Sequence, residues 1–223
     1  MKKYKVVENF VSINGEGTLA GQLAVFIRFQ GCNLNCSYCD TAWANETNCD
    51  FIEMTKEEIA EYIKSTGIYN VTLTGGEPLL QEYIKDLIEY LLENDALTIE
   101  IETNGSVDLA TIKLITSENL KLTMDYKLLS SDMERHMCIN NLILLGKKDT
   151  IKFVAGSLED LELAKSLINQ YNLIQRTNVH ISPVFGKINP DTIVEWMKDN
   201  SMNRVTLQLQ LHKVIWGMDT KGV

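Results

Sequence analysis

The chain has 223 residues, of which 45% are hydrophobic and 23% are charged, and its formal net charge is −9. These proportions are typical of a globular protein, and a net negative chain lacks the basic footprint of extended nucleic-acid binding. No stretch approaches the roughly 18 consecutive apolar residues of a membrane-spanning helix, and no apolar segment follows the basic start to suggest a secretory signal.

Strand and helix patterns alternate along the chain. A buried strand is expected over 23–29, followed by a helix over 55–65 in which Thr55 and Glu58 have capping-box spacing. Further strands are expected over 71–74, 97–102, 120–127, 150–154, 179–182 and 204–209, and further helices over 81–94, 157–170 and 190–199. With three prolines and no repeat or linker, the pattern favours one domain over 1–223.

This alternation predicts an α/β fold with a mostly parallel sheet. Right-handed crossovers wind such a sheet toward a barrel. About six strands are too few for the eight of a closed barrel, so we expect a partial, TIM-like barrel.

Distinctive residues follow the ends of the expected strands. Gly75, Gly76 and Glu77 come after 71–74, Thr103 follows the next strand, and Lys127 ends another. The C-terminal rim of a parallel sheet is where such folds place their binding sites. We therefore expect the functional site at this edge.

Three of the five cysteines lie within eight residues, as Cys32, Cys36 and Cys39 in a C-x3-C-x2-C pattern. An odd, crowded set is unlike a secreted disulfide framework and indicates a metal centre in a reducing cytoplasm. Three thiolates leave a cubane iron–sulfur cluster with one open iron. A structural zinc site or a fully ligated cluster would need a fourth ligand. Cys49 is a candidate for it, whereas Cys138 is too distant in sequence to assign.

The cysteine loop, preceded by 26–29 and Gly31, resembles the signature of radical S-adenosylmethionine (SAM) enzymes. Tyr38, the aromatic residue before the third cysteine, fits that family, and 74–78 resembles its Gly-Gly-Glu-Pro motif. The resemblance implies a radical SAM core with a [4Fe-4S] cluster on the three cysteines. The open iron would bind the amino and carboxylate groups of SAM, and one electron would cleave SAM to a hydrogen-abstracting 5′-deoxyadenosyl radical.

The same resemblance implies which residues contact SAM. Glu77 would accept hydrogen bonds from the SAM ammonium group. The implied SAM contacts are Tyr38, Gly75, Gly76, Glu77, Asp125 and Lys127. Two alternatives stay open at this point: 74–78 as an ordinary strand-to-helix turn, and Lys127 as a member of a structural ion pair.

The run from Ser12 to Gly17 resembles the S-x-Q-G-E-G segment of the 7-carboxy-7-deazaguanine synthase family, with Asn14 in place of the family's Gln. Asp40-Thr41 after the last cysteine and the tail 210–213 also match. In that family the reaction is a radical ring contraction of 6-carboxy-5,6,7,8-tetrahydropterin, which releases ammonia and regenerates SAM. The resemblance makes the chain a carbon–nitrogen lyase of 7-deazapurine (queuosine precursor) biosynthesis.

The family resemblance also implies substrate contacts, a metal and partners. The substrate would contact Ile13, Asn14, Gly15, Glu16, Arg28 and Thr74. Thr41 would bind Mg²⁺ through its hydroxyl, with substrate oxygens completing the shell. A reducing donor such as flavodoxin or ferredoxin, a homodimer and a cytoplasmic location are expected, with no nucleic-acid partner and no membrane.

Two other functions compete with this one. A glycyl-radical-enzyme activase, also a short radical SAM enzyme, would abstract hydrogen from a partner protein. The Gly15-Glu16-Gly17 run and the Cys39-Asp40-Thr41 ending favour the small-molecule enzyme. A non-catalytic iron–sulfur or zinc scaffold would not need the Gly-Gly-Glu-Pro rim beside a three-cysteine loop.

Overall fold

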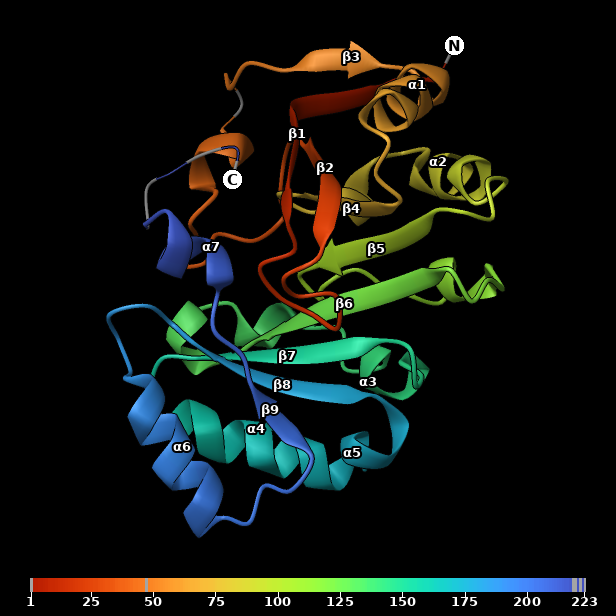
Figure 1. The fold of residues 1–223 in the computed structure, drawn as a ribbon. Coiled ribbons are helices and arrows are strands. Elements are labelled where there is room, and N and C mark those ends of the chain that lie inside the picture. The colour runs from red at the N-terminus through yellow and green to blue at the C-terminus, as the bar shows by residue number, and fades with distance from the viewer. Residues whose placement is uncertain (1, 47, 218–219, 221, 223) are drawn as a thin grey trace.

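The computed structural model describes residues 2–46, 48–217, 220 and 222. Its strands form one sheet in the order β3-β1-β2-β4-β5-β6-β7-β8-β9 (Figure 1). The strands are β1 (Tyr4–Ile13), β2 (Leu23–Phe29), β3 (Ile52–Met54), β4 (Asn70–Gly75), β5 (Thr98–Thr103), β6 (Leu120–Lys127), β7 (Thr150–Ala155), β8 (Asn178–Pro183) and β9 (Val205–Leu207). The helices are α1 (Lys56–Thr66), α2 (Ile84–Leu91), α3 (Asn141–Leu144), α4 (Leu158–Gln170), α5 (Leu173–Arg176), α6 (Pro190–Asp199) and α7 (Leu211–Ile215).

The sheet is a partial barrel. From β2 to β9 every neighbouring pair is parallel, whereas β1 pairs antiparallel with both β2 and β3. β3 and β9 are its two edges. The expected open, mostly parallel sheet is confirmed, and β1 and β3 extend it beyond the expected strands.

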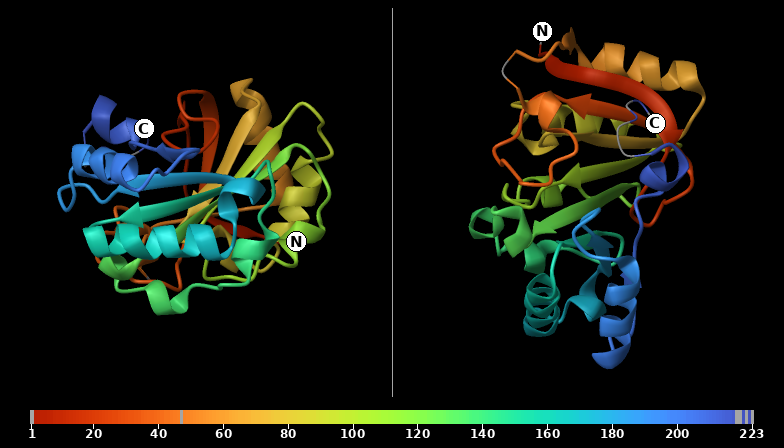
Figure 2. Two further views of the ribbon diagram at one scale, coloured as in Figure 1. Left: turned by 90° about the horizontal axis from the view of Figure 1, so that it is seen from below. Right: turned by 90° about the vertical axis from the view of Figure 1, so that its left-hand side faces the viewer.

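Alternation along the strands separates an apolar outer face from a polar inner face. On β5, Ile99 and Ile101 are fully buried in the apolar core, whereas Glu100 and Glu102 face the other way. The outer face packs against the helices, which lie along the outside of the curved sheet (Figure 2). The inner face is left for the pocket. Across the described ranges, every helix is too short or too polar to span a bilayer.

Capping residues and a proline in the sequence correctly predicted where most of the expected helices begin. The capping box at Thr55 and Glu58 is formed, the Ser157 side chain accepts from the Asp160 backbone before α4, and Pro190 opens α6. The helix expected over 81–94 was too long. A short 3₁₀ turn at Pro78–Leu80 comes before it, and α2 spans only Ile84–Leu91.

β1 was missed for a physical reason. Its pairing with β2 shifts register between Val6 and Glu8. A bulge of this kind changes which side chains face the core and so breaks the simple alternation that marks a strand in a sequence. The result is a long strand whose sequence, YKVVENFVSI, shows no single period.

Candidate active site

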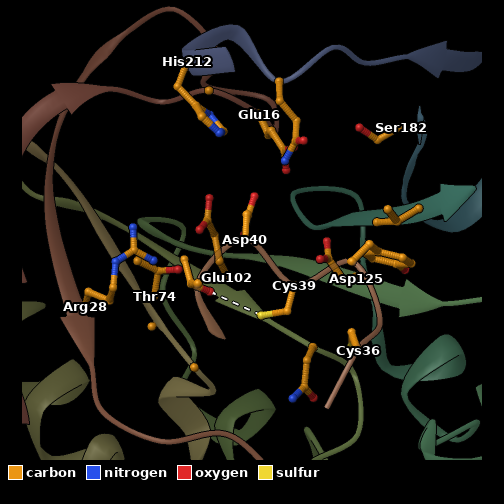
Figure 3. Close-up of a pocket in the computed structure, with 18 of the residues that line it drawn as sticks. Glu16, Arg28, Cys36, Cys39, Asp40, Thr74, Glu102, Asp125, Ser182 and His212 are labelled. Carbon is orange, nitrogen blue, oxygen red and sulfur yellow. Dashed lines mark hydrogen bonds between the residues drawn. The ribbon is translucent and has the colours of Figure 1, made fainter. Parts of the chain in front are cut away.

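The inner face of the sheet and the loops at its C-terminal rim enclose a cavity of about 760 Å³. In Figure 3, Cys36 and Cys39 lie on one side of it and Glu16 and His212 on the other, with Arg28 and Asp125 between them. The predicted site residues that line it are Ile13, Gly15, Glu16, Arg28, Cys32, Cys36, Tyr38, Cys39, Thr41, Thr74, Gly75, Gly76, Asp125 and Lys127. Asn14 and Glu77 are not part of the lining.

The cysteine loop packs closely on the Gly-Gly turn after β4. The Gly76 and Glu77 backbone amides donate to the Phe29 and Gly31 carbonyls, at 3.1 and 2.8 Å. A Cβ at Gly76 would lie 2.0 Å from the Gly31 oxygen, so no larger residue fits there without a shift. The glycines therefore fix the cysteine loop to the rim of the sheet.

The three loop cysteines suit a cubane cluster. All three are free thiols that line the pocket, and burial raises the pKa values of Cys32 and Cys36. Among the described residues, no three His, Cys, Asp or Glu side chains converge as they would around a single metal ion. A cubane instead takes each thiolate at a separate iron. The donor set therefore fits a [4Fe-4S] cluster and not a structural zinc.

Cys49 and Cys138 do not supply a fourth ligand from the pocket, since neither lines it. The Cys49 sulfur lies 3.3 Å from the Gln30 amide nitrogen and 3.5 Å from the Ala44 carbonyl oxygen. The alternative of a cluster completed by Cys49 therefore has no support in this geometry. One iron is left for another ligand, as the cysteine count predicts.

Four contacting charges form one side of the cavity: Glu16, Asp125, Lys127 and Lys152, which we call the charged wall. Lys152 contacts the Glu16 carboxylate and lies 2.8 Å from one Asp125 oxygen, while Lys127 lies 2.7 Å from the other. Burial opposes ionisation of Asp125, but Lys127 and Lys152 hold its pKa below the usual value. Burial likewise opposes the charge on Lys152, yet Asp125 and Glu16 raise its pKa well above the usual value. Opposite charges within the wall therefore favour the ionised forms of Asp125 and Lys152.

Arg28 and Thr74 are aligned neighbours on β2 and β4. The Arg28 Nε donates to Glu8 at 2.8 Å, and its terminal nitrogens have no hydrogen-bond partner among the described residues. Glu102, on the neighbouring strand β5, also lines the cavity. Burial, and next the negative charge of Glu100, raise the pKa of Glu102 to about 7.

Asn14 does not reach the pocket as expected. It is 1% exposed; its side-chain nitrogen donates to Glu100 at 3.2 Å, and its oxygen accepts from Thr72 at 2.8 Å. Its backbone groups bond to Gln22 and Gly21. Asn14 thus holds the loop that carries Glu16, and its contact with substrate stays a prediction.

Glu77 is also absent from the pocket lining. Its carboxylate is fully buried and accepts hydrogen bonds from the Leu79 amide, the Thr103 hydroxyl and the Asn104 amide at 3.0, 2.9 and 2.6 Å. Burial raises its pKa to about 7. The side chain lies behind the pocket surface, and its contact with SAM stays a prediction.

Residues of the tail line the cavity beside the Glu16 loop. The His212 ring packs on Gly15, where a Cβ would lie 2.6 Å from Nδ1, and the Leu211 amide donates to the Gly15 carbonyl. Lys213 pairs with Asp40 at 2.9 Å. The tail match noted in the sequence therefore lies at the pocket.

Sequence reasoning missed Lys152, Glu102 and Glu8 at this site. The signal was available for two of them: Lys152 lies within the apolar run of β7, as Arg28 does in β2, and Glu102 alternates with isoleucines on β5. A charge inside a buried strand needs a partner or a function. Applied to every strand, this test would have found both residues.

Comparisons with known proteins agree with this geometry. The model of the radical SAM superfamily matches residues 26–199. The chain is 57% identical to the 7-carboxy-7-deazaguanine synthase of Clostridium acetobutylicum over 220 residues, which cover 99% of each chain. It is 34% identical to that of Chlorobaculum tepidum over 221 residues, covering 98% of this chain and 96% of the relative.

Solved structures share the fold. The crystal structure of QueE from Escherichia coli superposes with a TM-score of 0.73 at 23% identity, covering 94% of this chain and 95% of that one. Streptococcus suis SuiB bound to S-adenosylmethionine gives a TM-score of 0.59 at 16% identity, covering 84% of this chain and 50% of that one. The radical SAM core expected from the cysteine loop is thereby confirmed. The chain belongs to the radical SAM superfamily and, within it, to the 7-carboxy-7-deazaguanine synthase family.

Proposed function

We propose that this chain is a radical SAM carbon–nitrogen lyase that converts 6-carboxy-5,6,7,8-tetrahydropterin to 7-carboxy-7-deazaguanine and ammonia in 7-deazapurine biosynthesis. Full-length similarity to synthases of that name supports it. The relatives compared above carry no activase name, so the rival activity on a partner protein gains no support from them.

The observation that carries the proposal is the state of the Glu16 carboxylate. One oxygen contacts Lys152, whereas Oε1 is buried without a hydrogen-bond partner among the described residues. A buried acceptor without a donor is costly. The amide and amino N–H groups of a pterin would supply two donors to such a carboxylate. Glu16 therefore suits the guanidine-like edge of this substrate.

The opposite charge for the substrate comes from Arg28. Its terminal nitrogens, which have no hydrogen-bond partner in the part of the chain that the structure describes, form a planar fork that matches a carboxylate. Glu102, with its pKa near 7, lies on the same side and offers either a donor or an acceptor. Together with Ile13, Gly15 and Thr74 on the lining, these groups would hold a flat, polar, carboxylated ring.

The cofactor end would hold the cluster on its three cysteines and SAM beside them. The cluster and SAM, when bound, supply the electron and the radical that abstracts hydrogen from the substrate. Tyr38 and the Gly-Gly turn would shape the SAM pocket, and Asp125 and Lys127 would present an ionised pair to SAM's polar groups. The charged wall thus meets both ligands.

Mg²⁺ would bind between the two ends. The Thr41 hydroxyl lines the pocket and lies 3.7 Å from the Cys39 sulfur. A single neutral hydroxyl is a weak ligand, and Mg²⁺ keeps waters when protein ligands are few. We therefore expect firm binding only when the substrate carboxylate joins Thr41.

Other expectations remain part of the proposal. A homodimer, a small reducing protein such as flavodoxin or ferredoxin as electron donor, and a cytoplasmic location all suit a biosynthetic enzyme of this family. Neither a nucleic acid nor a membrane is expected as a partner, given the net charge of −9.

Substrate binding to Glu16 gives the direct test. Calorimetry of the carboxy-tetrahydropterin should show clear binding to the SAM-loaded wild type and binding weakened about 10- to 100-fold in Glu16→Gln, because a charge-assisted acceptor is lost. Glu162→Gln on α4, outside the pocket, is the matched control. Equal affinity for all three proteins would remove Glu16 from the substrate site.

A further inference from the structure

The loop after β5 reaches the cysteine loop through the side chains of Asn104 and Ser106, and of these two Asn104 contacts a cysteine sulfur. Asn104 is 7% exposed, and its amide nitrogen lies 3.4 Å from the Cys32 sulfur and 3.1 Å from the Asn33 side-chain oxygen. The Leu34 backbone amide also donates to the Cys32 sulfur at 3.4 Å. At Cys39, by comparison, the Asn45 amide nitrogen is 4.0 Å away. The Thr41 hydroxyl lies 3.7 Å from the Cys39 sulfur, so the two N–H contacts to Cys32 are shorter than either contact to Cys39.

The orientation of the Asn104 amide is fixed. The Ser106 backbone N–H donates to Asn104 Oδ1 at 2.9 Å, and the Ser106 hydroxyl lies 2.6 Å from the same oxygen. A backbone N–H can only donate, so the atom it meets must be the oxygen. The amide N–H groups must therefore face Cys32.

The Gly-Gly-Glu-Pro motif holds Asn104 in this position. Glu77 accepts from the Asn104 backbone amide at 2.6 Å and from the hydroxyl of Thr103, the residue before it, at 2.9 Å. The Glu77 amide in turn bonds to Gly31 beside Cys32. Glu77 therefore ties the rim of β5, through its buried carboxylate, to the start of the cysteine loop, through its backbone amide.

We propose that Asn104 is a positioning residue that sets the reduction potential of the cluster by donating an N–H to the Cys32 thiolate, with Glu77 as its anchor. A reduced cluster carries one more negative charge, which spreads onto its sulfur ligands. A donor at a ligand sulfur stabilises that form and raises the potential. The motif glutamate then acts on electron entry through Asn104.

The test is an EPR-monitored redox titration of the reconstituted cluster, without SAM or substrate, so that its result is independent of the proposed reaction. Asn104→Leu keeps the bulk and loses the donor, and its midpoint potential should shift to more negative values at full iron content. Asn45→Leu, whose amide is more distant from a sulfur, should shift it less.

Two variants of equal charge provide a second test, which does not depend on whether Asn104→Leu binds its full iron content. Asn104→Asp and Asn33→Asp place a carboxylate at the same loop contact, but only the first removes the donor to Cys32. Asn104→Asp should have the lower potential of the two. Glu77→Gln should also lower the potential relative to wild type, since an amide N–H would face the Asn104 N–H.

Two results would overturn the proposal. One is a wild-type potential in fully loaded Asn104→Leu, and the other is an equal potential in the two aspartate variants. An unchanged potential in Glu77→Gln would overturn its role as the anchor.

Discussion

The two ends of the pocket are built in different ways. At the cluster end, thiols are surrounded by neutral donors such as Asn104, Thr41 and the Leu34 amide. Toward the substrate end, Lys152 of the charged wall pairs with Glu16 and Asp125, so side chains of opposite formal charge lie against one another. A cluster that must accept an electron gains from neutral donors, whereas a polar, charged substrate needs fixed charges of both signs.

This difference predicts separable effects. Changes at the cluster end should alter iron content or potential before any substrate is added. Changes at Glu16 or Lys152 of the charged wall should leave the cluster intact and alter substrate handling.

The largest effect is expected from Cys36→Ala. Wild-type protein, reconstituted anaerobically, should carry about four irons per chain, and the variant should lose them together with all SAM cleavage. Cys138→Ala changes a free thiol outside the pocket and should keep its iron. Iron analysis and absorption spectra measure the cluster content of each variant. A cluster that is retained in Cys36→Ala but lost in Cys138→Ala would contradict the proposed set of cysteine ligands.

Lys152→Met should be next. It removes the cation between the buried Glu16 and the partly exposed Asp125, and leaving a buried carboxylate unpaired costs about 3–5 kcal/mol of folding free energy. Substrate affinity should fall while the iron content stays at the wild-type level. Anaerobic urea unfolding and binding calorimetry measure both.

The matched control for Lys152 is Lys113→Met, which breaks the 2.6 Å pair with the buried Asp149 outside the pocket. It should lower stability but spare substrate binding. If both lysine variants bind substrate as wild type does, the charged wall has no part in substrate handling.

Arg28→Met should have a smaller, purely substrate-side effect. Losing hydrogen bonds to a charged group costs about 1.5–3 kcal/mol, so KM for the pterin should rise by about 10- to 100-fold. SAM cleavage without substrate should be unchanged. Arg176→Met on α5, whose guanidinium binds the Ile143 carbonyl outside the pocket, is the control. If steady-state kinetics give Arg28→Met the same KM as wild type, the substrate carboxylate does not bind to Arg28.

The smallest effect concerns pH. Burial raises the pKa of Glu102 to about 7 from 4.5, so the folded chain holds this proton more tightly than the unfolded chain. Its contribution to stability is fully present below pH 4.5 and is lost as the pH rises through 7. Glu102→Gln should therefore gain about 2 kcal/mol relative to wild type between about pH 5 and about pH 8. The measurement is the free energy of unfolding of both proteins as a function of pH. If the difference between wild type and Glu102→Gln is the same at every pH, the pKa of Glu102 is not raised.

The sequence predicted the cluster end of the pocket better than it predicted the charged wall. The cluster end lies within a few residues of chain, so Cys32, Cys36, Cys39 and the Gly-Gly turn could be placed from motifs alone. The charged wall joins Glu16, Asp125 and Lys152, which lie on separate elements, and only the folded sheet brings them together. Spacing along the chain carries no signal for such a contact.

The family motifs predicted the positions of residues along the chain better than they predicted the contacts of the side chains. Asn14 and Glu77 lie where the family segments predict, but their side chains turn into the protein and support Glu100 and Asn104. A sequence motif fixes the place of a residue along the chain. Which neighbour its side chain reaches depends on packing between elements, which the motif does not contain.

The central claim is that one pocket brings a cluster-bound cofactor to a carboxylated pterin. The most direct measurement is anaerobic turnover of the reconstituted protein with SAM, a low-potential reductant, Mg²⁺ and 6-carboxy-5,6,7,8-tetrahydropterin, with products read by mass spectrometry. Formation of 7-carboxy-7-deazaguanine and ammonia without net consumption of SAM is the predicted result. A fully loaded protein that cleaves SAM but leaves the pterin unchanged would contradict the claim.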